Sequence, residues 1–200
     1  IDLVFEPALD VPGELDLVVT AYNKIPYETS INVIAPSGAY IILDDLITSA
    51  GEDDILDYGE TGSFHVEIEN VGQEASGDLL INLSHDGTMI NVLSNDLTHT
   101  PVDPGELATV GPFDVEVSWN VDDGSVAPII VIVSGENQQW EHEMSVSIEA
   151  PSFLILNSDL VDNSNGTLDP GESISMEITL LNIGNSPVSY PTFEATTSDP

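Results

Sequence analysis

The stretch from residue 159 to residue 184 holds the side chains most able to do chemistry in this sequence. Carboxylate, amide and hydroxyl groups crowd its first half, a Pro-Gly turn follows, and it contains no Lys, Arg or His. Calcium takes about six to eight oxygen ligands, and a loop with Gly and Pro can bring such ligands together. We therefore predict a calcium site in this loop, with the following ligands: Asp159, Asn163, Asn165, the Thr167 carbonyl, Asp169 and Glu172. The alternative interpretation is an acidic, solvated turn.

A first acidic loop lies earlier in the chain at a fixed spacing from this second one. Residues 56–60 (LDYGE) match residues 168–172 (LDPGE), and residues 70–72 (NVG) match residues 182–184 (NIG). Subtracting 57 from 169 and 70 from 182 gives 112 in both cases, which is about one domain length. The candidate calcium ligands of the first loop are Asp45, Asp53, Asp57 and Glu60. The recurring Gly-Glu pair also has a purely structural interpretation, in which Gly permits a tight turn and Glu begins a strand.

The charge of the chain excludes several classes of partner. The sequence has 36 Asp and Glu residues against one basic residue, Lys24, and its formal net charge is −35. Such a chain is repelled by nucleic acid and by anionic membranes. Its self-repulsion also requires cations or salt, supplied either by calcium in extracellular water or by a highly saline medium. The sequence has no apolar run of about 18 residues, so we expect no membrane insertion.

Other site chemistries find little support, and we predict no enzyme activity. The chain has no Cys, so a thiolate zinc site, a disulfide or a cysteine nucleophile is excluded within these residues. The four histidines are scattered without metal-ligand spacing, and no Gly-x-Ser-x-Gly sequence is present. A phosphate-binding loop needs a Lys that Lys24 does not supply in the required context.

The elements that must position these loops are short strands. Alternating patterns such as residues 64–68 and 113–119 indicate half-buried strands, and the apolar run 129–133 indicates a central strand. No segment has a convincing helical period. About seven such strands at intervals of roughly 8–15 residues predict an all-β fold of tandem immunoglobulin-like sandwiches. We expect the larger aromatic side chains to form core or edge packing rather than a carbohydrate-binding face: Tyr22, Tyr27, Trp119, Trp140 and Tyr190.

The repeat divides the chain into three parts. Residues 1–40 are predicted to be the C-terminal half of one domain, residues 41–150 a complete domain, and residues 151–200 the N-terminal half of a further one. Half a sandwich leaves its core and strand edges uncovered. The chain is therefore either an excerpt of a longer polypeptide, or a subunit whose two end segments complete a sandwich head to tail with neighbouring copies.

The combination of acidic loop, LDPGE, alternating strand, Asn-x-Gly and the later Pro104-Gly105-Glu106 resembles a known group of modules. These are the tandem immunoglobulin-like (CARDB or adhesion-like) modules of large secreted bacterial surface proteins. They are similar to those that follow the catalytic domain in gingipain-type cysteine peptidases, and residues 15–33 resemble the end of the small domain directly after that catalytic domain. The resemblance implies export to the cell surface, calcium in the loops and no catalysis in this chain. The first loop departs from the pattern because Tyr58 stands where the second loop has Pro.

Three functions stay open at this point. The first is a calcium-stiffened extracellular stalk or filament, whose partners are adjacent immunoglobulin-like domains or copies of the chain itself. The second is an accessory region behind a secreted cysteine peptidase. The third is an adhesion module that binds a glycan or a protein.

Overall fold

The computed structural model describes residues 12–34, 37–161, 167, 170–171, 173–188, 191–194 and 196 of the 200-residue chain. All regular elements in these residues are strands, which confirms the predicted all-β class. No helix of the described part is long and apolar enough to cross a membrane. The strands are β1 Gly13–Val19, β2 Tyr27–Val33, β3 Ile41–Ala50, β4 Leu56–Asp57, β5 Thr61–Asn70, β6 Leu79–Ser84, β7 Ile90–Val92, β8 Asp96–His99, β9 Leu107–Val117, β10 Ser125–Ser134, β11 Gln139–Glu149, β12 Phe153–Val161 and β13 Ser175–Asn182.

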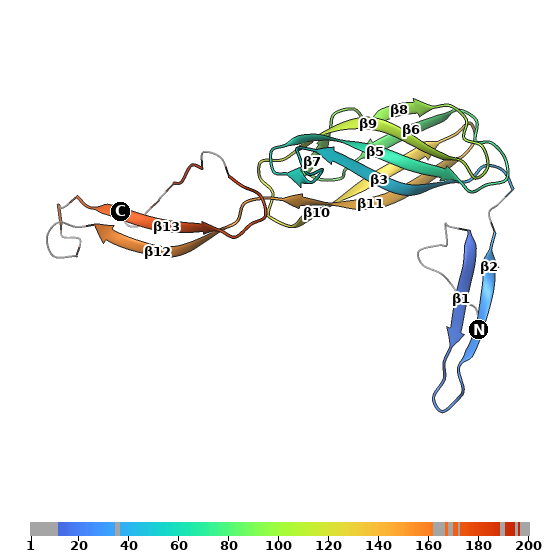
Figure 1. Ribbon diagram of the computed structural model, residues 1–200, viewed down its shortest axis with the longest axis horizontal. Coiled ribbons are helices and arrows are strands. Elements are labelled where there is room, and N and C mark those ends of the chain that lie inside the picture. The colour runs from blue at the N-terminus through green and yellow to red at the C-terminus, as the bar shows by residue number, and fades with distance from the viewer. Residues whose placement is uncertain are drawn as a thin grey trace.

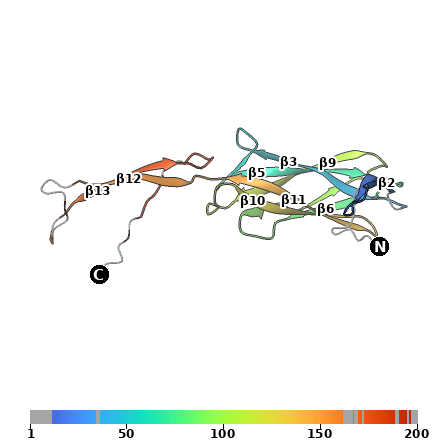
Figure 2. The same ribbon diagram turned by 90° about the horizontal axis from the view of Figure 1, so that it is seen from below.

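Strands β3 to β11 form an immunoglobulin-like sandwich of two sheets. One sheet has the order β3-β5-β9-β7 and the other has the order β4-β11-β10-β6-β8. Neighbouring strands in both sheets pair antiparallel, except that the short β4 runs parallel to β11. Figure 2 shows β3, β5 and β9 in one layer and β6, β10 and β11 in the layer below it. The core between the layers draws its residues from Ala39 to Ile148.

The predicted alternation accounts for the strands at the centre of each sheet. In β5, Phe64, Val66 and Ile68 are completely buried, while the residues between them are half-buried. Strand β10 lies between β11 and β6, so the apolar run that predicted a central strand is confirmed. Its completely buried side chains are Ala127, Ile129, Val131 and Val133.

Two strands of the sandwich were not predicted from the sequence. Residues 96–99 read Asp-Leu-Thr-His and contain one apolar side chain, yet they form β8 because β6 offers them a free edge. Strand β4 has only two residues, and it forms where Leu56 is buried against the end of β11. In both places tertiary contact decides the conformation, and local periodicity carries no signal.

Two hairpins flank the sandwich and leave it at opposite ends (Figure 1). Strands β1 and β2 pair at the N-terminal side, and strands β12 and β13 pair at the C-terminal side. Each hairpin is a separate two-stranded sheet with many exposed apolar side chains. The assignment of the hairpins to incomplete domains stays a prediction.

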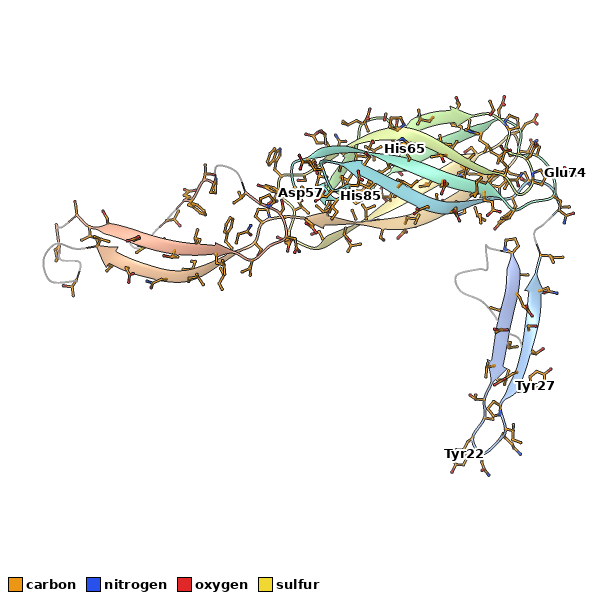
Figure 3. All side chains as sticks on the ribbon, in the orientation of Figure 1. Tyr22, Tyr27, Asp57, His65, Glu74 and His85 are labelled. Atoms are coloured by element: carbon orange, nitrogen blue, oxygen red, sulfur yellow. The ribbon has the colours of Figure 1, made fainter. Side chains whose placement is uncertain are left out.

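The aromatic side chains divide between core and surface. Trp140 is 9% exposed and belongs to the core, as expected. Trp119 is 72% exposed and lies outside the core, but it packs edge to face on Tyr58 with ring centroids 5.6 Å apart, which agrees with edge packing. Tyr22 and Tyr27 are exposed on the N-terminal hairpin, away from the sandwich (Figure 3), so the packing prediction is wrong for these two. Tyr190 lies outside the described residues.

Candidate functional site

The second acidic loop falls largely outside the described residues. Four of its predicted ligands, Asn163, Asn165, Asp169 and Glu172, lie there. Of the other two, Thr167 is exposed, and Asp159 is exposed on β12, where it accepts a hydrogen bond from the Asn157 side-chain amide at 2.6 Å. The calcium site of this loop stays a prediction.

Three of the four candidate ligands of the first loop, Asp45, Asp53 and Glu60, accept hydrogen bonds from nearby backbone N–H groups. The carboxylate of Asp45 accepts a hydrogen bond from the backbone N–H of Leu46 at 2.8 Å, and that of Asp53 accepts one from Ile55 at 3.2 Å. Within the described ranges no group of three or more His, Cys, Asp or Glu side chains could hold a metal ion as placed. Calcium binding by this loop therefore rests on the sequence and stays a prediction.

The Gly-Glu pair of the first loop closes a turn. The Glu60 carboxylate accepts the backbone N–H of Asp57 at 3.1 Å, and the N–H of Glu60 returns to the Asp57 carbonyl at 3.1 Å. Gly59 between them has a φ of 68°, and a Cβ at this position would overlap the ring of Trp119. Figure 3 places Asp57 at the end of the sandwich from which β12 and β13 leave.

The same turn recurs after the long loop before β9. The Glu106 carboxylate accepts a hydrogen bond from the N–H of Asp103 at 2.9 Å, and the N–H of Glu106 donates to the Asp103 carbonyl at 3.0 Å. Gly105 has a φ of 75°. In the second loop Gly171 also has a positive φ, 88°. At residues 57–60 and 103–106 the Asp-x-Gly-Glu sequence is therefore a turn that opens a strand, in agreement with its purely structural interpretation.

A buried asparagine organises the loop that follows β5. The side-chain oxygen of Asn70 accepts the N–H of Tyr40 at 3.1 Å and that of Gly72 at 3.0 Å. Its side-chain nitrogen donates to the carbonyls of Glu74 and Val102, each at 2.8 Å. Asn70 is 0% exposed, so one amide satisfies four buried or half-buried backbone groups.

The second Asn-x-Gly sequence builds the same arrangement at the spacing of 112. Asn182 accepts the N–H of Ser152 at 3.0 Å and that of Gly184 at 3.1 Å, and it donates to the Ser186 carbonyl at 2.9 Å. A Cβ on Gly184 would overlap the backbone from Ala150 to Ser152, as a Cβ on Gly72 would overlap the backbone from residue 38 to residue 40. The repeat seen in the sequence is thus a repeat of backbone geometry.

Asp123 joins the sandwich to the C-terminal hairpin, and we call its contacts the junction clamp. The Asp123 carboxylate accepts the N–H of Ala150 at 3.0 Å and the N–H of Asn185 at 3.2 Å. The side-chain amide of Asn185 donates to it as well, at 3.1 Å. The Tyr58 hydroxyl approaches the Pro187 carbonyl at 3.5 Å on the same end of the sandwich.

These donors shift the ionisation of Asp123. Hydrogen bonds from the backbone N–H groups of Ala150 and Asn185 hold the pKa of the Asp123 carboxyl below its usual range, against a smaller opposing effect of desolvation. A carboxyl whose pKa is lower in the folded state stabilises that state above its unfolded pKa of 3.8. The contribution is lost as the pH falls through the still lower folded pKa.

We predict that Asp123→Ala loosens the junction and leaves the sandwich folded. The amide protons of Ala150 and Asn185 should exchange with solvent at least several-fold faster, because they lose a charged acceptor. Hydrogen exchange followed by NMR at neutral pH measures this rate. The matched control is Asp122→Ala, which removes the same charge from the neighbouring position. Equal exchange rates in both variants would contradict the clamp.

Comparison with known proteins gives structural likenesses and no family. No family model matches the chain, and no curated protein matches it. A crystal structure of Escherichia coli alpha-2-macroglobulin that begins at domain MG7 is 14% identical, with coverage of 64% of this chain and 19% of that one and a TM-score of 0.43. A cryo-EM reconstruction of native E. coli alpha-2-macroglobulin is 16% identical, with coverage of 76% and 9% and a TM-score of 0.49.

A third solved structure is the FixG-related protein from Vibrio parahaemolyticus. It is 12% identical, with coverage of 57% of this chain and 98% of that one and a TM-score of 0.32. The chain spans less than a fifth of either macroglobulin chain. At these scores we transfer no activity, ligand or location from the three proteins.

Proposed function

We propose that this chain is a non-catalytic structural protein of the cell exterior, built from immunoglobulin-like sandwich units joined in series as a stalk or filament. The observation that carries the proposal is the repeated asparagine geometry. Asn70 organises the N-terminal end of the central sandwich, and Asn182 organises the start of the C-terminal hairpin in the same way. The hairpin is then the opening of another sandwich unit.

Burial at equivalent positions supports this interpretation. Subtracting 112 places Met176 of β13 on Phe64 of β5 and Ile178 on Val66. Phe64 and Val66 are both 0% exposed, whereas Met176 is 61% and Ile178 is 45% exposed. The hairpin therefore carries the apolar face of a sandwich without its second sheet.

One contact of the kind that a second sheet would make is present between Phe153 and Phe193. Phe153 is equivalent to Ile41 of β3, and Phe193 is equivalent to Ile81 of β6. The Phe153 and Phe193 rings pack edge to face with centroids 5.9 Å apart. Both equivalent isoleucines are completely buried in the central sandwich.

The N-terminal hairpin supplies the complementary half. Val19 and Tyr27 face each other across β1 and β2, as Val133 and Trp140 do across β10 and β11. Strands β10 and β11 belong to the sheet that faces β3 and β5. The β1–β2 hairpin of one unit is therefore shaped to cover the β12–β13 hairpin of another, either in an adjacent domain or in the next copy of the chain.

Calcium is part of the proposal because of the charge. A net charge of −35 repels neighbouring units, and divalent cations bound at acidic loops near the junctions would reduce this repulsion and stiffen the series. Calcium is abundant outside the cell, which agrees with the proposed location.

The test measures small-angle X-ray scattering and thermal unfolding of the purified chain. Both are recorded with calcium, with a chelator, and with magnesium at one fixed ionic strength. We expect the maximum dimension to grow with protein concentration along one axis, and calcium at about 100 times its Kd to raise the Tm by roughly 10 °C.

The two parts of the proposal, the series of units and the role of calcium, can be contradicted separately. A globular monomer at every concentration and in every buffer would overturn the series of units. Equal stabilisation by calcium, magnesium and monovalent salt would overturn the calcium part and make the charge an adaptation to brine.

A further inference from the structure

Two Asp-Gly pairs lie in the central sandwich, and their surroundings differ. They are Asp86-Gly87 in the turn between β6 and β7, and Asp123-Gly124 before β10. An Asp-Gly pair can rearrange without an enzyme, because Gly has no Cβ to shield its amide nitrogen from the carboxyl carbon of the preceding residue. The chain therefore offers the same reaction two different surroundings.

At Asp123-Gly124 both reacting groups are held by hydrogen bonds. The Asp123 carboxylate accepts the N–H groups of Ala150 and Asn185, and the N–H of Gly124 donates to the Ile148 carbonyl at 3.1 Å. Attack of the Gly124 nitrogen on the carboxyl carbon would break these bonds. The junction clamp thus protects its own Asp-Gly pair.

At Asp86-Gly87 the reacting groups are exposed at the surface. Within the part of the chain that the structure describes, neither the Asp86 carboxylate nor the Gly87 N–H makes a hydrogen bond to another protein group. The carboxyl group can therefore turn toward the Gly87 nitrogen without breaking a protein contact.

His85 places a base beside Gly87. Its Nδ1 lies 2.7 Å from the Pro128 carbonyl, which can only accept, so in the neutral ring Nδ1 carries the proton and Nε2 a lone pair. Nε2 is buried and has no hydrogen-bond partner among the described residues. It lies so close to Gly87 that a Cβ on that residue would be 2.5 Å from it. A buried acceptor without a partner requires an explanation, and a proton from the Gly87 amide would supply one.

We propose that Asp86-Gly87 is a site of self-modification, at which the chain converts the Asp86 linkage to isoaspartate with His85 as general base. First, the Gly87 nitrogen bonds to the side-chain carbon of the protonated Asp86 carboxyl. The amide proton passes to Nε2 of His85 and then to the hydroxyl group, which leaves as water. The exposed Gly87 peptide must rotate to present its N–H to Nε2, which a glycine allows.

The product of this first step is a five-membered succinimide ring. Water then adds to the main-chain carbonyl of the ring, and the bond from that carbon to the Gly87 nitrogen breaks. The main chain now continues through the Asp86 side-chain carbon. One water is released and one is consumed, so the net change is an isomerisation.

Isoaspartate adds one carbon to the main chain of the turn that leads into β7. Strand β7 has three residues and pairs with β9 through Ile90 and Val117, which are both at most 3% exposed. A longer turn shifts the start of β7, so we expect modified molecules to lose this pairing first. The proposal concerns the central sandwich alone and does not rest on the series of units.

The test incubates the purified chain for weeks at neutral pH, once folded and once in urea. Peptide mapping by mass spectrometry with electron-based fragmentation measures isoaspartate at positions 86 and 123. In the folded chain we expect at least tenfold more isoaspartate at Asp86 than at Asp123. In urea the two positions should react at similar rates, because neither the clamp nor the contact with His85 is left.

His85→Gln tests the base. The glutamine amide can still donate to the Pro128 carbonyl, but it takes up no proton. We expect Asp86 in the folded variant to react at least threefold more slowly, with no change in urea. Hydrogen exchange at residues 86–89 measures the mobility of the turn in both chains, so a slower reaction at equal mobility identifies His85 as the base.

Asp86→Glu is the matched control for the effect on β7, because it keeps the charge and cannot form the five-membered ring. Amide exchange in β7 should rise during incubation of the original chain and stay constant in this variant. No isoaspartate at Asp86 in the folded chain, or equal amounts at Asp86 and Asp123, would overturn the site. An unchanged rate in His85→Gln would overturn the role of His85. Since the site is decided on the unchanged chain, unfolding of a variant cannot obscure it.

Discussion

Of the substitutions to alanine predicted for this chain, Phe64→Ala should lower the free energy of unfolding of the sandwich the most. Phe64 and Phe113 are both 0% exposed and face each other across β5 and β9. Removing a completely buried phenylalanine ring costs about 3–5 kcal/mol, through lost burial and the cavity left behind. This is a large part of the roughly 5–15 kcal/mol that stabilises a typical domain. Urea unfolding followed by the fluorescence of Trp119 and Trp140 measures the change.

The repeat offers a matched control for this substitution. Met176 occupies the equivalent position on β13 and is 61% exposed. Met176→Ala should therefore change the free energy of unfolding of the sandwich by less than about 0.5 kcal/mol. A dilute sample keeps units apart, and under this condition a cost for Met176→Ala equal to that for Phe64→Ala would contradict the exposed hairpin face. A cost that grows with protein concentration would show that the face becomes buried on association.

Much of the fold could be predicted because buried strands carry a periodic signal. In β5 the alternation of Phe64, Val66 and Ile68 with polar residues is the direct consequence of one face packing on the core. Strand β8 could not be predicted in the same way, because it is a short edge strand in which only Leu97 is apolar and packs, partly buried, against the core. A large aromatic side chain predicts packing without saying where, and Trp119 packs outside the core, on the surface ring of Tyr58 and over Gly59.

The acidic loops are a different case. Carboxylates close together in sequence predict shared ligation, which stays a prediction, and in the structure Asp53 and Glu60 each accept a nearby backbone N–H. The carboxylate that links two parts of the molecule is Asp123, and its partner Asn185 is 62 residues away. No spacing rule connects these two residues. The asparagines, in contrast, were visible from sequence, because the Asn-x-Gly pair recurs at 112 and only the repeat singles it out.

Asn70→Ala is expected to be nearly as damaging as the loss of the Phe64 ring. The substitution removes the partner of four backbone groups, on Tyr40, Gly72, Glu74 and Val102. Leaving a buried polar group unsatisfied costs about 1–3 kcal/mol, and water that enters the cavity and bonds to these groups reduces the total loss of stability. We expect a loss of about 3 kcal/mol or more in the free energy of unfolding, measured in urea.

Asn182→Ala tests whether the same geometry serves a different purpose at the junction. Its contacts to Ser152, Gly184 and Ser186 lie beyond the core of the central sandwich. The stability of the sandwich should therefore stay within about 0.5 kcal/mol of the original chain, while amide exchange at residues 183–186 should rise. If Asn182→Ala instead destabilised the sandwich as much as Asn70→Ala, the hairpin would belong to the same cooperative unit. The two asparagines would then be two supports of one fold, and the series of separate units would lose its main argument.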